Sequence, residues 1–244
     1  MNPLTRAAAT SAAAAVIAGT SLLGTRYLAI GVAGLVAVAA FGWPRLLRVY
    51  RRRVSSAIIG VSGLLSILAV GLGRGEPYLR YAVAAAAGAV LLALTAEVFF
   101  PSPRGRAITS VTGMMAGAMV AVSSAAWVAS ARTPGAEDLV VAGAACLAIA
   151  GVATIVTSNS QINAVISIVA SIGAGIGLGF VFPSIGWYAG ILVGAAASTA
   201  VLLVTELGER EPTPRSPIAA IAAGVTPILA SGVLVYLGGR LLVG

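Results

Sequence analysis

The chain contains no lysine and no histidine, one cysteine, and only seven acidic residues among 244 positions. Without histidine it lacks the commonest general base and metal ligand. Its only cysteine, Cys146, has no second thiol with which to form a disulfide or a cysteine-based metal cage. A phosphate-binding loop of the Walker type requires a lysine. The sequence therefore predicts no metal site and no cofactor, and it favours a protein that is not an enzyme.

Charged residues are scarce, and long stretches of the chain exclude them. They make up 9% of the sequence, whereas 59% is hydrophobic, and the mean hydropathy is +1.03. Soluble domains carry about 25% charged residues. About 20 apolar residues of helix cross the hydrocarbon core of a bilayer, and apolar runs near that length recur throughout this chain. The sequence therefore predicts an integral membrane protein whose first partner is the lipid bilayer.

The apolar runs show no two-residue alternation, so they are expected to be helices rather than barrel strands. The predicted fold class is all-α: a polytopic transmembrane helical bundle of about nine spans. The whole chain, 1–244, is expected to form a single integral membrane domain with no soluble domain, because the gaps are too short to build a separate core. The predicted spans are 7–24, 28–43, 54–72, 81–100, 107–130, 139–157, 162–182, 187–204 and 218–239.

The first span is rich in alanine and contains Thr10, Ser11, Thr20 and Ser21, so its insertion into lipid is weakly favourable. Arg6 ahead of an apolar run also resembles a signal peptide, whose removal would leave eight spans. The second apolar run follows after only a few residues, as in a tight helical hairpin. Retention of the first span is therefore the favoured interpretation.

Arginine supplies every basic residue, and its distribution predicts the orientation of the chain. The gap after the second span is the most basic and holds Arg45, Arg48, Arg51, Arg52 and Arg53. Basic loops stay in the cytoplasm. Counting spans from this loop places ten arginines on the cytoplasmic side and five outside. The N-terminus is thus expected in the cytoplasm of a multi-pass inner (plasma) membrane protein, with arginines meeting lipid headgroups rather than nucleic acid.

Three hairpins resemble one another and suggest a repeat. Arg26-Tyr27, Arg80-Tyr81 and Trp187-Tyr188 each open a span, and those spans end near Pro44-Arg45, PSPR at 101–104 and PTPR at 212–215. Parallel repeats are one way in which transporters form a central pathway. Ordinary placement of aromatic residues and arginines at membrane interfaces produces similar motifs without duplication. Both interpretations remain open.

Glu97 and Glu206 are the acidic residues nearest the membrane interior. A carboxylate inside a span often marks a proton or cation path. Both residues lie about one turn from the predicted cytoplasmic boundary, near arginines. Interfacial ion pairs are therefore the favoured role, and a coupling role in transport is the alternative.

Small residues form a stripe in the seventh predicted span. Ser167, Ser171, Gly175 and Gly179 recur every four residues, and Gly173 and Gly177 occupy an adjacent strip. This spacing lets two helices approach backbone to backbone, and it predicts a packed interior helix. The alternative is an unwound stretch that lines a cavity. Gly113 and Gly117 in the fifth predicted span are a second close-contact pair.

Two further polar features lie near span ends or interrupt a span. Asn159, Gln161 and Asn163 precede or open the seventh predicted span. They are expected to cap a helix, with contact to a polar solute as the alternative. Pro227, preceded by Thr226, is expected to kink the last span. Such a kink serves either as a gate or as a packing adjustment.

The phrases FGWPRLL at 41–47, EPYLRY at 76–81 and SSAAWVA at 123–129 resemble an uncharacterised group of actinobacterial multi-span membrane proteins, described as permease-like or hypothetical. The resemblance covers about the first half of the chain. It implies an inner-membrane location and transfers no substrate, cofactor or site residue.

Two classes of function remain. The first is a permease-like secondary transporter that carries a small-molecule substrate along a path beside the glycines of the seventh span and Thr226. The second is a non-transporting membrane subunit or scaffold that docks a protein partner in cell-envelope biogenesis. A water-accessible cavity at the bilayer midplane distinguishes the first class from the second.

Overall fold

A computed structural model describes residues 3–73, 75, 77–134, 136–210 and 216–242. In this part of the chain every regular element is an α-helix, which confirms the all-α fold class. The helices are α1 (Pro3–Leu22), α2 (Thr25–Leu46), α3 (Arg52–Leu72), α4 (Ala82–Phe99), α5 (Ala107–Ser123), α6 (Ala125–Arg132), α7 (Glu137–Ala153), α8 (Ser160–Val181), α9 (Gly186–Arg210) and α10 (Pro217–Leu242).

Each predicted span coincides with a helix, and the fifth coincides with α5 and α6 together. Seven of these segments are long and apolar enough to cross a membrane: α2, α3, α4, the α5–α6 run, α8, α9 and α10. The other two are α1, whose hydropathy is lowered by serine and threonine, and α7, which has 17 residues and a length of about 26 Å. The structure thus supports an integral membrane protein, and the count of nine spans stays a prediction.

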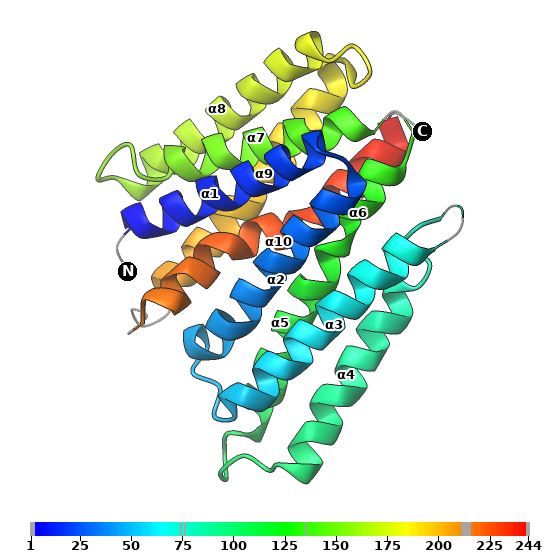
Figure 1. Cartoon of the computed structure of the whole chain (residues 1–244). Helices are drawn as coiled ribbons and strands as arrows, with labels where there is room; N and C mark the ends of the chain where they lie inside the picture. The colour runs from blue at the N-terminus through cyan, green and yellow to red at the C-terminus, as the bar shows by residue number, and fades with distance from the viewer. Residues whose placement is uncertain (1–2, 74, 76, 135, 211–215, 243–244) are drawn as a thin grey trace.

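The helices form a bundle in which α3 and α4 are inclined to α1, α7 and α8 (Figure 1). On one side α2, α3, α4 and α5 pack together, and on the other side α7, α8 and α9 do so, with α1 and α10 between the two groups. The main core extends across these groups and contains the largest fully buried side chain, Trp127 of α6. A smaller cluster of Val49, Ile58, Ala93 and Met114 lies beside it. Helices α6, α7 and α10 are therefore central, whereas α4 and α8 lie at the edges.

The first helix is packed into the bundle along one face. Thr10 is buried and its hydroxyl donates a 2.8 Å hydrogen bond to the carbonyl of Gly224 in α10. A Cβ atom on Gly224 would lie 2.7 Å from the Arg6 carbonyl, and one on Gly151 of α7 would lie 2.9 Å from the Thr10 side chain. Helix α1 therefore approaches α10 through its backbone at Gly224 and α7 through the Thr10 side chain at Gly151, as small residues permit in membranes.

One end of the bundle collects most of the arginines, and we call it the basic end. It contains the N-terminus of α1, the α2–α3, α4–α5 and α7–α8 connections, and the C-terminus of α9 (Figure 1). Its exposed arginines include Arg48, Arg51, Arg52, Arg53, Arg104 and Arg106. The direction of successive spans thus alternates, as the arginine pattern predicts. Which end of the bundle faces the cytoplasm stays a prediction. Arg74, Glu76 and 211–215 lie outside the described residues, as does the side chain of Arg210.

The three helices of the predicted repeat have different surroundings. Helix α2 packs against α1, α3 and α10, α4 packs only at the edge against α3 and α5, and α9 packs against α7, α8 and α10. The exit element at 212–215 lies outside the described residues. Shared interfacial residues do not give these helices equivalent positions in the fold, so the structure adds no support to a duplication.

Candidate functional site

The small-residue stripe of α8 is a helix interface. Ser167, Ser171, Gly175 and Gly179 are all buried against α7 and α9. The Ser171 hydroxyl lies 2.9 Å from the Gly194 carbonyl and 3.2 Å from that of Cys146. A Cβ atom on Gly175 would overlap the Gly190 carbonyl of α9, and one on Gly179 would lie 2.6 Å from the Gly186 carbonyl. Backbone packing therefore fills the face on which a transport path was considered.

The adjacent strip of α8 faces outward. Gly173 and Gly177 are exposed, and nothing lies within 4 Å of a Cβ atom placed on either residue. The prediction of an interior helix is therefore wrong, because only one face of α8 is covered. Residues such as Val165, Val169 and Phe180 share the exposed surface. Helix α8 runs unbroken from Ser160 to Val181, so the unwound alternative is wrong as well.

The centre of the bundle is closed around Trp127. Its indole Nε1–H donates a 2.7 Å hydrogen bond to the carbonyl of Ile228 in α10, one residue beyond Pro227. The ring also lies against Gly232, where a Cβ atom would be 2.9 Å from Trp127 Cδ1. The Thr226 hydroxyl is turned back onto the Ala222 carbonyl at 2.8 Å. Thr226 is thus satisfied within its own helix and is buried by packing.

Gly113 and Gly117 form the second close contact that the sequence predicts. Trp43 of α2 donates from Nε1 to the Gly113 carbonyl at 2.9 Å. A Cβ atom on Gly117 would lie 2.6 Å from both Trp43 Cδ1 and Ile59 Cδ1. These glycines admit an indole ring from α2 and an aliphatic side chain from α3, so the close partner is a side chain rather than another backbone.

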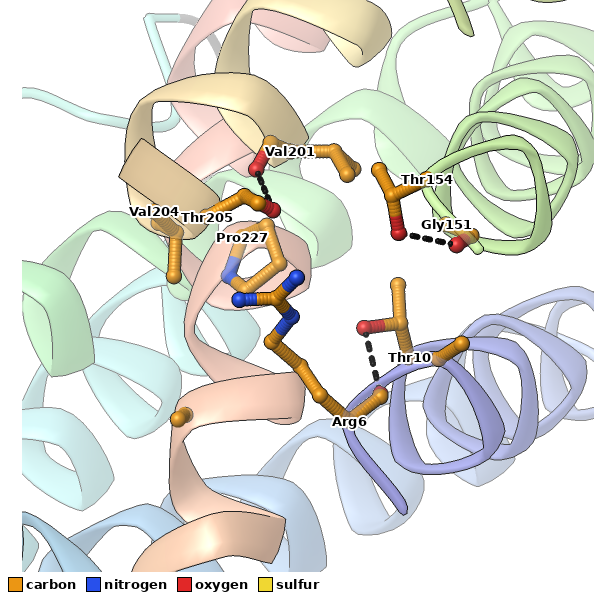
Figure 2. A pocket seen from close by; sticks show the side chains of 10 residues that line it. Arg6, Thr10, Gly151, Thr154, Val201, Val204, Thr205 and Pro227 are labelled. Carbon is orange, nitrogen blue, oxygen red and sulfur yellow. Dashed lines mark hydrogen bonds between the residues drawn. The ribbon is translucent and has the colours of Figure 1, made fainter. Parts of the chain in front are cut away.

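A narrow crevice lies where α1, α7, α9 and α10 meet. Figure 2 shows the residues that line it: Arg6, Ala7, Thr10, Gly151, Thr154, Val201, Val204, Thr205, Ala223 and Pro227. The hydroxyls of Thr154 and Thr205 bond to the carbonyls of Gly151 and Val201, at 2.7 and 2.8 Å. The crevice leaves no room for a water molecule. In the structure, Pro227 therefore lies beside a closed contact between four helices.

Both candidate glutamates lie at the basic end, as predicted. Glu97, in the last turn of α4, accepts hydrogen bonds from the backbone N–H of Ser102 at 2.6 Å and from its hydroxyl at 3.0 Å. Its partner is thus the connection to α5 rather than an arginine. Glu206 is exposed near the end of α9 and lines a groove of about 390 Å³ with Ser160 and Gln161 of α8. Neither carboxylate lies at the midplane of the bundle.

The basic end is ordered by contacts between its loops. The Arg51 guanidinium donates to the Pro101 carbonyl at 3.4 Å and lies over the Phe100 and Tyr50 rings, 5.9 and 5.8 Å from their centroids. This contact joins the α2–α3 connection to the α4–α5 connection. Arg45 instead bonds the Phe41 carbonyl of its own helix. Among the arginines that set the predicted topology, Arg51 therefore joins two loops of the basic end, whereas Arg45 stays on its own helix.

Asn159 caps the start of α8, as favoured from the sequence, and Asn163 in the first turn of α8 anchors the preceding loop. The side-chain Oδ1 of Asn159 accepts from the N–H groups of Gln161 and Ile162, at 2.9 and 3.3 Å. Buried Asn163 closes the α7–α8 connection, because its amide donates to the Thr154 and Thr157 carbonyls at 2.9 and 2.8 Å. Its Oδ1 accepts from both the N–H and the hydroxyl of Thr157.

Asn163→Ala is expected to lower the free energy of unfolding by about 2 kcal/mol, because it leaves buried carbonyls of the connection without donors. Thermal unfolding in detergent measures the effect. Gln161→Ala is the control, since this exposed side chain is two residues away on the same turn, and its melting temperature should match that of the wild type. Equal melting temperatures for all three proteins would show that the Asn163 bonds contribute nothing.

Arg132 has a structural role that was not predicted from the sequence, where it was only one of the five arginines placed outside the cytoplasm. At the end opposite the basic end it donates to the carbonyls of Val70, Gly71 and Gly73, and it lies 4.6 Å from the Tyr78 ring centroid. These carbonyls belong to the C-terminus of α3, where a cation is favourable. A distant arginine that caps a helix leaves no local sequence pattern, so no motif could have identified it.

Searches against protein-family models, curated proteins and solved structures found no match to this chain.

Proposed function

We propose that the protein is a non-transporting membrane subunit whose basic end docks an acidic partner protein. The observation that carries this proposal is the closed centre: Ser167, Ser171, Gly175 and Thr226, the residues considered for a path, are buried in helix contacts. Their hydroxyls bond to backbone carbonyls, so no polar group among them is left for a solute. The proposal includes no enzymatic activity and places the protein in the plasma membrane with its basic end in the cytoplasm.

The exposed arginines supply the docking surface. Arg52 and Arg53 begin α3, and Arg104 lies in the α4–α5 connection, which Arg51 contacts. An ordered cationic surface attracts acidic partners and speeds their association. The short connections of the bundle provide no soluble domain of their own, so a partner would supply the cytoplasmic activity. The permease-like resemblance of the first half of the chain is compatible with this placement, but it identifies no partner.

A permease-like carrier is the second candidate, and the break in one central span favours it. The fifth predicted span breaks between α5 and α6 at Ser124. Helix α10 is continuous, but Pro227 removes one of its backbone hydrogen bonds, and the Trp127 bond to Ile228 links this point to α6. Discontinuous helices at the midplane form the substrate sites of many transporters. In this alternative the structure is an occluded state, and the crevice in Figure 2 is its closed cytoplasmic mouth.

Thiol labelling in membranes tests whether the centre opens. In a Cys146→Ala background, Ser171→Cys and Thr226→Cys are exposed to a membrane-impermeant maleimide in intact cells and in inside-out vesicles, with and without a proton gradient. We expect no labelling at either position, whereas Ser158→Cys, in the exposed α7–α8 connection, should label from the cytoplasmic side. Labelling at residue 171 or 226 from either side would identify an open path and overturn the proposal in favour of the carrier.

Photocrosslinking in cells tests the docking surface. A photoreactive residue at position 104, at the basic end, should give one adduct of defined mass. The same residue at position 26, exposed at the opposite end, should give none. The position-104 adduct should disappear when Arg52→Gln and Arg53→Gln are combined. Adducts that persist after both arginines are removed, or that form equally at position 26, would contradict docking at the basic end.

A further inference from the structure

A separate cavity of about 350 Å³ lies at the basic end, between the α2–α3 connection and the first turn of α5. Its polar lining consists of Arg48, Tyr50, Arg106, Thr109 and Ser110. The arginines assigned to partner docking, Arg52, Arg53 and Arg104, are not part of this lining. Two arginines and three residues with hydroxyl groups therefore line one partly open cavity.

The cavity is closed on one side by the uncapped N-terminus of α5. The first backbone bond of this helix runs from the Ser110 N–H to the Arg106 carbonyl at 2.9 Å. The N–H groups of Ala107, Ile108 and Thr109 consequently have no acceptor inside the helix, and the N-cap residue Arg106 provides no side-chain cap. The positive end of the helix dipole adds to the field of the two arginines, an arrangement that favours an anion.

Ser110 points to a ligand independently of the helix terminus. Its side chain is 3% exposed, and its hydroxyl has no hydrogen-bond partner within the described part of the chain. A buried hydroxyl without a partner is costly, yet serines inside helices usually bond to a carbonyl one turn back. Ser110 lines the cavity, although its hydroxyl oxygen is covered by neighbouring atoms. Rotation of this side chain about χ1 would bring the hydroxyl to an oxygen atom of a bound ligand.

Arg48 occupies a backbone conformation that favours glycine. Its φ is +53°, in the left-handed region, directly after the end of α2. There the N–H of Val49 bonds back to the Pro44 carbonyl at 2.9 Å, which closes the helix terminus. Glycine is the usual residue at such a terminus. At this position an arginine lines the cavity together with Arg106, and guanidinium groups match the oxygens of phosphate.

We propose that this cavity binds the phosphate group of an anionic ligand. Two guanidiniums, a free helix N-terminus and an unpartnered serine hydroxyl together suit a group that carries several charged oxygens. A phospholipid headgroup and free phosphate share this chemistry. The site lies outside the docking surface and the bundle centre, so the proposal does not depend on the proposed function.

Binding measurements on the full chain in maltoside detergent, which contains no phosphate, test the site. The probes are inorganic phosphate and a short-chain phosphatidylglycerol, followed by native mass spectrometry and by titration for Kd. Arg48→Gln and Arg106→Gln should each weaken binding about ten-fold or more, since each removes a charge-assisted contact. Ser110→Ala, which keeps the charge, should weaken binding about five-fold. Arg53→Gln and Arg104→Gln remove the same charge outside the cavity, and their Kd should stay within about two-fold of wild type.

The outcomes separate the two ligand sources. Phosphate that displaces the lipid would identify the phosphate group itself as the determinant, and binding of the lipid alone would identify a headgroup site. Equal losses in the cavity and control variants would mean that only surface charge matters, and this result would overturn the proposal. Absence of binding by both probes would also overturn it. Melting temperatures check that each variant is folded. If Arg106→Gln does not fold, the Arg48 and Ser110 variants still test the site.

Discussion

Gly175→Leu is expected to separate α8 from α9 and to lower the free energy of unfolding by at least about 3 kcal/mol. A leucine has no space there, because even a Cβ atom would overlap the Gly190 carbonyl. The opposing atom belongs to the backbone, so no side-chain rotation relieves the overlap. The yield of folded protein and the melting temperature in detergent measure the loss.

Gly173→Leu is the matched control. It lies two residues away in the same helix, and nothing stands within 4 Å of its Cβ position. Glycine is a poor helix former, so the control should leave stability unchanged or raise it by up to about 1 kcal/mol. Similar melting temperatures for the two leucine variants would contradict the close approach of α8 and α9.

Trp127→Ala is expected to destabilise the bundle by about 3–5 kcal/mol. The indole is fully buried, and it joins α6 to α10 through the Ile228 carbonyl. Truncation leaves a large cavity between the two central helices and removes the donor from that carbonyl. Chemical or thermal unfolding of the purified protein measures the change.

Two controls divide the effect of Trp127 into its parts. Trp127→Phe keeps most of the volume and removes the N–H donor, so its loss should be smaller than that of the alanine variant. Trp187→Ala truncates an indole that is 55% exposed at the start of α9, and it should cost under about 1 kcal/mol. An alanine variant at 127 as stable as the one at 187 would show that the centre is not held by this ring.

Helix positions follow closely from the sequence, because an apolar run in lipid must satisfy its backbone within itself. Every predicted span is helical, and the boundaries differ by a few residues. The break at Ser124 was not predicted. It lies within an uninterrupted apolar run, where neither proline nor charge marks it. There the backbone N–H of Trp127 donates to the Ser124 carbonyl, and the indole of the same residue packs against α10.

Which face of a helix is covered was predicted only in part. Ser167, Ser171, Gly175 and Gly179 were assigned correctly to a contact, since small residues permit close approach. Gly173 and Gly177 look the same in the sequence, yet they face outward. Lipid tails are as apolar as a protein core, so hydropathy does not distinguish a lipid-facing side from a packed one. The amino-acid composition of α8 therefore does not indicate that this helix lies at the edge of the bundle.

Contacts between distant residues could not be predicted from the sequence, for a different reason. Thr10 with Gly224, Trp127 with Ile228 and Arg132 with the end of α3 join segments far apart in the chain. Each is a single polar group that finds a backbone carbonyl, and carbonyls are present at every residue. The partner is then selected by which helices become neighbours, not by residue type.

By itself the sequence determined that this chain is a set of apolar helices suited to a bilayer, with most arginines between alternate spans. Those properties depend on local hydrophobicity and on backbone hydrogen bonds that each helix completes internally. Only the tertiary structure decided that α6, α7 and α10 are central, that packing closes the midplane, and that Arg48, Arg106 and Ser110 share one cavity. Those properties depend on which helices pack together, and close packing is a property of shape that hydropathy does not encode.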